Sequence, residues 1–302
     1  MSRIIAAIIL VLAISPAVLA HSEHEDTDPK GLFIYNEELA EGGLTLFAPK
    51  ANKAAGSNTT ESEVYLINME GEVVHSWPME DATSQYAFMA ENGDIIYRSG
   101  TQAHPTIFET GASWQRIDWD GNIVWSYEHQ YLHHDADIVS ENQMLFTYFE
   151  QFTDENRNNL VTSTKAPLAD QVWTDFFAVV DIETNEIVWE WHLQDELSYE
   201  KYPIGRNEEW THANSIEFLQ AGNPFSDGEV ILFSLRELSR AFAISYPEGE
   251  ILWVSEKDAL VGQHDPTLLD NGNILIFNNR SRQSEVLEVD PTTDEVVWSY
   301  TD

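Results

Sequence analysis

Five segments of the chain follow one template, and this repeat constrains the fold more than any other feature. In each segment a strand of alternating apolar and polar residues enters a turn with Glu-Gly, Asp-Gly, Thr-Asn or Thr-Asp, and a second strand ends near an aromatic residue. Such alternation around a short turn is typical of a β-hairpin. The five segments read VYLINMEGEVVHSW, WQRIDWDGNIVWSY, FAVVDIETNEIVWEW, FAISYPEGEILWVS and VLEVDPTTDEVVWSY.

The spacing of the repeat predicts propeller blades. The aromatic positions His75, Trp125, Trp189, Trp253 and Trp298 are 50, 64, 64 and 45 residues apart, which is the length of a blade. A second hairpin lies upstream of most of the five, so each pair makes a four-stranded blade. We therefore predict an all-β fold, a β-propeller of four-stranded blades with five blades visible. The segment GLTLFAP (43–49) opens the first blade and leaves it one strand short.

The two ends of the repeat set the predicted domain boundaries. Residues 1–20 combine an early arginine, an apolar run and a small-residue ending, as in a secretory signal peptide cleaved near Ala20. Residues 21–30 are polar and read as a disordered leader. Residues 31–302 then form a single propeller domain, periplasmic or secreted, with no membrane association after cleavage of the signal.

Charge and cysteine content exclude several classes of function. The formal net charge is −37, from 52 acidic and 15 basic residues, and such a surface repels nucleic acid and anionic lipid head groups. The chain has no cysteine, so thiol nucleophiles, redox dithiols and thiolate zinc sites are excluded. Tryptophans at the repeat positions are interpreted as apolar wedges between blades.

Three histidines occupy equivalent places in the repeat. His134, His212 and His264 each stand at the head of an apolar strand, in HDADIVSENQML, HANSIEFL and HDPTLLDNGNIL, although they are 78 and 52 residues apart. The first strand of every propeller blade lines the central channel, so we expect these side chains to gather at one mouth of that channel. Neutral imidazole is a competent nucleophile near neutral pH.

Aligning the hairpin turns of the repeat also places other residues near these histidines. Arg236 and Arg280 fall at equivalent positions, which Glu150 and Thr101 occupy in other blades. Asn214 follows His212 closely, and His133 precedes His134. The connecting segment 192–211, with Lys201, Tyr202 and Arg206, and the insertion 150–172 reach the same mouth and are predicted to shape a pocket there. By contrast, packing or surface positions are expected for His75, His129 and His192.

Several motifs of the chain resemble those of the aryl-sulfate sulfotransferase family, whose members are exported propeller enzymes. The resemblance covers residues 30–302. It rests on GLFIYNEELAEGGLTLFAP with VYLINMEGEVVHSWP, and on HHDADIV, EWTHANSIEF, SLRELSR and VGQHDPTLLDNGN.

The resemblance implies transfer of a sulfuryl group from an aryl sulfate to a phenolic acceptor, with no nucleotide sulfate donor and no cofactor. It assigns the nucleophile to His264, which would carry the sulfuryl group as a sulfohistidine in a ping-pong cycle. His134, His212, Asn214 and Arg236 would surround the transferring group. The registers and the connecting segment, rather than the resemblance, predict that His133, Lys201, Tyr202, Arg206 and Arg280 bind substrate. The family propeller has six blades, and a lysine from the last blade assists at its site. This chain stops at Asp302 directly after the fifth hairpin, and that lysine has no counterpart. Either the ring closes with five blades, or the chain is a shortened form whose channel stays partly open.

Three other readings stay open from the sequence. The first is a non-catalytic propeller that binds a ligand or a protein. The second is a quinone-cofactor dehydrogenase, because hairpins such as DIETNEIVWEW resemble that family's blade motif, although those enzymes are much longer. The third is a zinc or copper site of His134, His212 and His264, which we do not favour because Asp135 and Asp265 would alternate away from the channel. The sequence does not determine the oligomeric state.

Overall fold

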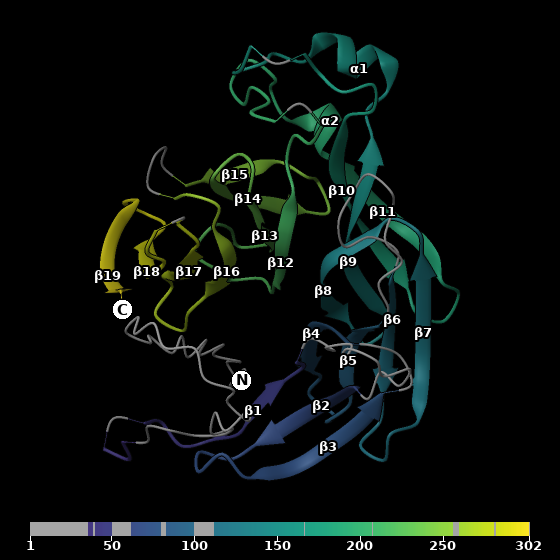
Figure 1. Cartoon of the computed structure of the whole chain (residues 1–302), viewed down its shortest axis with the longest axis vertical. Helices are drawn as coiled ribbons and strands as arrows, with labels where there is room; N and C mark the ends of the chain where they lie inside the picture. The colour runs from purple at the N-terminus through teal and green to yellow at the C-terminus, as the bar shows by residue number, and fades with distance from the viewer. Residues whose placement is uncertain are drawn as a thin grey trace, which may run out of the picture. The chain divides into compact units, whose positions relative to one another are not determined.

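The computed structural model describes residues 36–38, 40–49, 62–79, 83–99, 112–165, 167–206, 208–255, 260–280 and 282–301. The predicted signal peptide, the predicted leader and Thr101 lie outside these residues. The fold is all-β, and its antiparallel sheets are propeller blades, as the repeat predicted (Figure 1). Among the described residues no helix has the length and apolar character that crossing a membrane requires.

The chain divides into two compact units, of which the first comprises residues 1–100 and 114–126. Its first sheet has three described strands, β1 (Thr45–Phe47), β2 (Ser62–Ile67) and β3 (Val73–Met79). β1 lies inside the segment 43–49 that was predicted to open this blade, and it pairs with β2. The second sheet contains β4 (Thr83–Met89), β5 (Ile95–Ser99), β6 (Ala112–Ile117) and β7 (Ile123–His129). The first residues of β6 and the last residues of β7 belong to the other unit.

The second unit comprises residues 101–113 and 127–302 and holds three four-stranded sheets. The first is β8 (Leu132–Ser140), β9 (Gln143–Gln151), β10 (Trp173–Asp181) and β11 (Glu186–His192). The next is β12 (Ala213–Leu219), β13 (Glu229–Leu235), β14 (Arg240–Tyr246) and β15 (Ile251–Val254). The last is β16 (His264–Leu268), β17 (Ile274–Asn278), β18 (Glu285–Asp290) and β19 (Glu295–Thr301).

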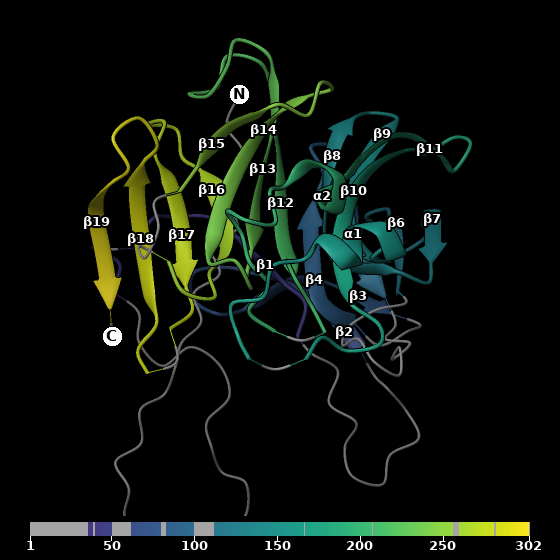
Figure 2. The same cartoon turned by 90° about the horizontal axis from the view of Figure 1, so that it is seen from above.

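The first strands of these three sheets lie side by side, with β12 between β8 and β16 (Figures 1 and 2). Side chains of one first strand accept hydrogen bonds from the backbone of the next. Asp135 Oδ2 and Asp137 Oδ2 accept from the amides of Ile216 and Phe218 at 2.8 and 2.6 Å. Ser215 Oγ and Glu217 Oε2 likewise accept from Asp265 and Leu268 at 3.0 and 2.8 Å. These side chains satisfy backbone groups that have no ladder partner on that edge.

Indole groups join neighbouring sheets at the outer strands. Trp189 Nε1 in β11 donates to the carbonyl oxygen of Pro247 at 2.8 Å, and Trp253 Nε1 in β15 donates to Asp294 Oδ1 at 2.8 Å. The acceptors lie in the outer hairpin turn of the following sheet. The predicted role as wedges between blades therefore holds for these two tryptophans, while Trp298 in β19 is 50% exposed.

Gly249 shows how closely one of these turns approaches its neighbour. Trp191 Nε1 donates to the Gly249 carbonyl oxygen at 3.2 Å. The glycine has a φ of +76°, and a Cβ atom there would lie 2.6 Å from Trp191 Cδ1. Both the backbone conformation and the available space therefore require glycine.

One core cluster of the second unit lies between the sheets β8–β11 and β12–β15, and another lies between β12–β15 and β16–β19. Aromatic rings interlock in the first cluster, with Phe177 and Phe242 each within 5.3 Å of Phe233 between ring centroids. Two short helices, α1 (Asp154–Asn159) and α2 (Leu193–Glu196), lie together beyond this core (Figure 1). Asn156 Nδ2 joins them through Asp195 Oδ1 at 2.8 Å.

Candidate functional site

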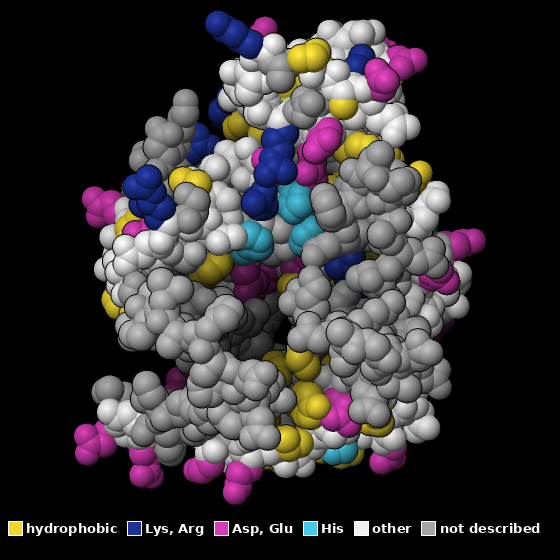
Figure 3. Space-filling view, viewed as in Figure 1, with side chains coloured by type: hydrophobic (Ala, Val, Ile, Leu, Met, Phe, Trp, Pro, Cys, Tyr) yellow, Lys and Arg dark blue, Asp and Glu magenta, His cyan; other side chains and the backbone are white. Residues whose placement is uncertain are grey.

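His134 and His212 come together although their sheets are far apart in the sequence. Their ring centroids are 4.7 Å apart, with an interplanar angle of 65°. β12 begins at Ala213, directly after His212, whereas β8 begins at Leu132, two residues before the predicted head of that strand. The contact between β8 and β12 thus places these two imidazoles against each other. Figure 3 shows histidine side chains gathered in one place, beside Lys and Arg side chains.

His264 lies at the start of β16, and the residues on either side of it bond to β12. Asn214 Nδ2 donates to the carbonyl oxygen of Gln263 at 2.8 Å, and the Asp265 amide donates to Ser215 Oγ at 3.0 Å. His264 is therefore held against the residues that follow His212. Its Nδ1 lies 3.0 Å from the carbonyl oxygen of Gly262. A carbonyl oxygen only accepts, so the proton is on Nδ1 and the lone pair of neutral His264 is on Nε2.

Gln263 fixes the strand that leads into His264. Its side chain is fully buried, and Nε2 donates to the carbonyl oxygens of Leu235 and Arg240 at 3.1 and 2.8 Å. Two carbonyl acceptors determine which end of the amide is the nitrogen. Asn214 is also buried, at 4% exposure, and its amide group bonds to backbone rather than facing solvent.

Behind His134, the predicted substrate-binding residue His133 is buried beside Asp175, a carboxylate that the sequence did not indicate. His133 is fully buried, stacks on Phe149 at 3.9 Å, and has its Nε2 3.0 Å from Asp175 Oδ1. The other ring nitrogen, Nδ1, lies 2.9 Å from His134 Nδ1. One of these two nitrogens donates and the other accepts, so the contact links the two imidazole rings.

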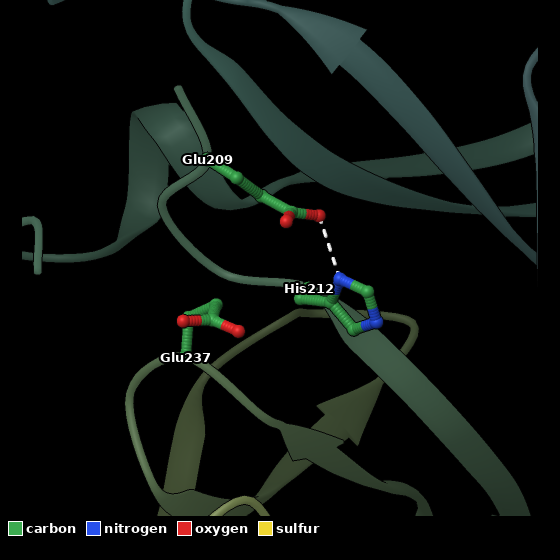
Figure 4. A group of neighbouring side chains, drawn as sticks. All are labelled: Glu209, His212 and Glu237. Atoms are coloured by element: carbon green, nitrogen blue, oxygen red, sulfur yellow. Dashed lines mark hydrogen bonds and ion pairs between the residues drawn. The ribbon is translucent and has the colours of Figure 1, made fainter. Parts of the chain in front are cut away.

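His212 is held by two groups. Its Nδ1 lies 2.7 Å from Glu209 Oε1, and Figure 4 shows this ring nitrogen directed at the carboxylate. The amide of Arg236 donates to the His212 carbonyl oxygen at 3.0 Å. The backbone of His212 has a φ of 53°, a left-handed conformation that is uncommon outside glycine and is stabilised here by these bonds.

Arg236 and Arg206 share one carboxylate. Arg206 Nε lies 2.8 Å from Glu237 Oε2, and Arg236 Nη1 donates to Glu237 Oε1. Glu237 is largely buried, while the two guanidinium groups are partly exposed. The predicted register of Arg236 thus places it next to His212, and Glu237 keeps both arginines at this edge of the site.

The charges around His212 favour its protonated form. Burial lowers the pKa of His212, but the hydrogen bond to Glu209 and the negative charges of Glu209 and Asp175 outweigh burial and the nearby Arg236. The net effect raises the pKa above its ordinary value. The raised pKa favours the imidazolium form of His212, which can act as a cation or a proton donor.

One group of described side chains has the spacing of a metal site. The ligand atoms of Glu209, His212 and Glu237 lie within 4.8 Å of one another. However, Glu237 already bonds two guanidinium groups, and His212 Nδ1 already bonds Glu209. The cationic neighbours compensate the two carboxylates, so we interpret the group as an ion-pair network. Asp135 accepts hydrogen bonds from the amides of Ala136 and Ile216 and thus does not support the histidine metal site.

The remaining predicted residues lie around this centre in different ways. Tyr202 is buried against Phe242, with ring centroids 5.6 Å apart, and Lys201 Nζ lies 5.2 Å from the centroid of the Tyr202 ring. Tyr202 is thus part of the core beneath the segment 192–211. Arg280 follows β17 and its Nε lies 3.3 Å from Glu285 Oε2. Arg206 thus lies beside Arg236, because both bond to Glu237, whereas Arg280 pairs with Glu285 within the last sheet.

The histidines expected at packing positions do pack. His75 stacks on Trp119 with ring centroids 4.3 Å apart, and His129 meets Tyr148 edge-on at 5.1 Å. His192 stacks on Phe176 at 4.9 Å and bonds to Glu150 Oε2 at 3.0 Å. Glu150, at the position equivalent to Arg236, is therefore a partner of His192.

Comparison with known proteins gives one family match. The model of a family described as arylsulfotransferase (ASST) matches residues 87–301. No curated protein matches the chain.

The solved structures found in the comparison include the following three. A Bacteroides caccae protein of unknown function is 16% identical, with a TM-score of 0.48 over 84% of this chain and 72% of its own. The WD40 β-propeller domain of Doa1 is 11% identical, with a TM-score of 0.48 over 89% of this chain and 67% of its own. Kuenenia stuttgartiensis hydrazine synthase is 10% identical, with a TM-score of 0.46 over 80% of this chain and 65% of its own.

Proposed function

The chain belongs to the arylsulfotransferase family, and from this premise we propose that it transfers a sulfuryl group from an aryl sulfate to a phenolic acceptor through a sulfohistidine on His264. The observation that supports the proposal most is the convergence of histidines from separate sheets. The rings of His134 and His212 are 4.7 Å apart, and bonds from Asn214 and Ser215 hold the backbone around His264 against the same strand. No cofactor enters the mechanism.

In the first half of the reaction, Nε2 of His264 attacks the sulfur of the donor. An N–S bond forms, the S–O bond to the aryl group breaks, and the phenolate leaves. Sulfuryl transfer resembles phosphoryl transfer in that charge lies on the peripheral oxygens, so the protein's task is to position the groups and supply cations. Arg236 and protonated His212 supply positive charge next to these histidines.

In the second half, the acceptor phenol attacks the sulfur of sulfo-His264. The phenolic proton must leave as the new S–O bond forms and the N–S bond breaks. His134 is suited to accept it, because a neutral imidazole is a competent base and its ring lies 4.7 Å from that of His212 at the same centre. Neutral His264 is then regenerated for the next cycle.

The direct test is an assay of phenol release from a chromogenic aryl sulfate, with and without an added phenol acceptor. We expect acceptor-dependent turnover, which distinguishes transfer from hydrolysis, and loss of phenol release in the His264→Ala variant. His75→Ala is a matched control, because His75 packs against Trp119 in the other compact unit. Phenol release by His264→Ala at the parent rate would exclude His264 as the nucleophile. Binding of aryl sulfate without turnover in the parent protein would instead favour a binding propeller.

We also propose that the protein is exported to the periplasm or secreted. The support is the sequence of residues 1–20, with its early arginine, apolar run and small-residue end. N-terminal sequencing of protein from a bacterial host should find a mature chain that starts at His21. A cytoplasmic product that retains Met1 would contradict the proposal.

A further inference from the structure

Glu209 is the described carboxylate that bonds to the ring of His212, and its position is fixed by the backbone around it. The chain at 208–210 pairs with the start of β10, since the Trp173 amide donates to the Glu208 carbonyl oxygen and the Trp210 amide donates to the Trp173 carbonyl oxygen, both at 2.9 Å. Trp210 is fully buried and its Nε1 donates to the Tyr202 carbonyl oxygen at 2.7 Å. The backbone bonds on either side of Glu209 therefore hold its carboxylate in place.

We propose that Glu209 is a positioning residue that keeps His212 as an imidazolium, so that the Nε2 proton of His212 goes to the phenolate oxygen as the donor's S–O bond breaks. This inference rests on the proposed sulfuryl transfer for its chemical step. Glu209 Oε1 accepts from Nδ1 at 2.7 Å, which holds the opposite ring nitrogen, Nε2, on the side of the ring away from the carboxylate (Figure 4).

The charges facing His212 show why Glu209 is needed. Asp175, from β10, and Glu209 favour the imidazolium, while Arg236 and burial disfavour it. The His134 ring, from β8, lies 4.7 Å away. Glu237 is compensated by Arg206 and Arg236, and Asp175 Oδ2 accepts from Thr211 Oγ1 and from the Ala213 amide. Without Glu209, burial and Arg236 would dominate, and the pKa of His212 would fall.

The proton balance of the first half-reaction then closes. His264 enters neutral and forms the N–S bond, and the electron pair of the broken S–O bond goes to the aryl oxygen. The proton of His212 Nε2 neutralises that oxygen, and neutral His212 remains beside sulfo-His264. In the second half-reaction His134 takes the proton of the acceptor phenol, and transfer of this proton to His212, whose ring centroid is 4.7 Å away, restores both rings. Such proton donation is worth about 10²- to 10⁴-fold, and it matters most when the phenol is weakly acidic and its oxide is a poor leaving group.

The test compares Glu209→Gln with Glu208→Gln in the full chain. Glutamine keeps the size of the side chain and removes its charge. Glu208 is the adjacent acid and its side chain is exposed, so it controls for the change in net charge. The first measurement is an NMR titration of the histidine rings, in which the His212 resonance is identified by its absence in His212→Asn.

We expect the pKa of His212 to fall by about one unit or more in Glu209→Gln and to stay within a few tenths of a unit in Glu208→Gln. The second measurement is the rate of phenol release from aryl sulfates whose phenols differ in acidity. Glu209→Gln should slow the weakly acidic phenols at least about tenfold more than the strongly acidic ones, a ratio that loss of stability alone would not change. The fall in rate at high pH, where His212 loses its proton, should also shift to lower pH.

Each outcome decides a separate claim. An unchanged His212 pKa in Glu209→Gln would overturn the role of Glu209. A lowered pKa with an unchanged ratio of rates would overturn proton donation by His212. The parent protein could release no phenol from any aryl sulfate while the pKa of His212 still falls in Glu209→Gln. The proposed function would then fail, and the effect of Glu209 on the protonation of His212 would stand.

Discussion

Asn214 affects His264 through the backbone. Its Nδ2 donates to the carbonyl oxygen of Gln263 at 2.8 Å, and the side chain is buried. The Gln263 carbonyl oxygen also accepts from Ser234 Oγ at 3.1 Å. The residue directly before His264 is thus fixed by two donors from the neighbouring sheet, and Asn214 sets the position of the imidazole without needing to touch the substrate.

For this reason we expect Asn214→Ala to lower the rate of phenol release and to lower the free energy of unfolding by about 1–2 kcal/mol, because a buried carbonyl loses one of its donors. Urea unfolding and the chromogenic assay measure the two effects. Asn142→Ala, at an exposed position of the β8–β9 turn, should leave both unchanged. Full activity in a folded Asn214→Ala protein would refute the positioning role.

At this scale the sequence indicated some of the site and missed the rest. The three histidines and Arg236 stand at repeat positions, so counting from the hairpin turns was enough to expect that they converge. Glu209, Asp175 and Glu237 occupy no repeat position, and their pairing with His212, His133 and Arg236 depends on tertiary contacts. One local signal was present: Glu209 lies three residues before His212 in EWTH, a spacing that let the left-handed turn at His212 bring the two side chains together.

At the scale of secondary-structure elements, the outer hairpins connect the sheets. The turn residues and the alternating pattern predicted these hairpins, but not the bulge that each of several outer pairs contains, as between Ala243 and Ile244. A bulge shifts the register by one residue, which a pattern of period two cannot reveal. The bulge also determines which aromatic residue reaches the next turn. The sequence could therefore predict that tryptophans join the sheets, but not which groups their indoles bond to.

The tryptophans of the last two sheets provide a matched comparison. Trp253 Nε1 donates to Asp294 Oδ1 of the next sheet at 2.8 Å, whereas Trp298 is half exposed at the equivalent place in β19. Trp253→Phe should lower the free energy of unfolding by about 1 kcal/mol or more, through the lost hydrogen bond and lost packing. Trp298→Phe should change it by less than about 0.5 kcal/mol. Equal losses in the two variants, measured by urea unfolding, would contradict the described role of the indole bonds.

At the scale of the whole molecule, the charge of −37 opposes folding. Like charges repel more strongly in a compact chain than in an expanded one, and salt screens this repulsion over about 10 Å at 0.1 M ionic strength. The cations near His212 are exceptions within an acidic chain. Composition indicated this imbalance directly, but it could not indicate where the few arginines gather.

We therefore expect the melting temperature to rise between about 0.01 M and 0.5 M NaCl, where a gain of about 1 kcal/mol corresponds to roughly 2–4 °C for a chain of this size. Tetramethylammonium chloride at equal ionic strength should give a similar rise if screening is the cause. A melting temperature that falls or stays constant in both salts would show that self-repulsion does not limit stability.

The central claim is that histidines from separate sheets form one centre at which His264 carries the sulfuryl group. Its most direct measurement is mass spectrometry of the protein quenched at high pH within one turnover of an aryl sulfate, with no acceptor present. The account predicts one added sulfuryl group on the peptide that contains His264, lost when a phenol is added and never formed in His264→Ala. A label on another residue, or turnover with no covalent intermediate, would contradict it.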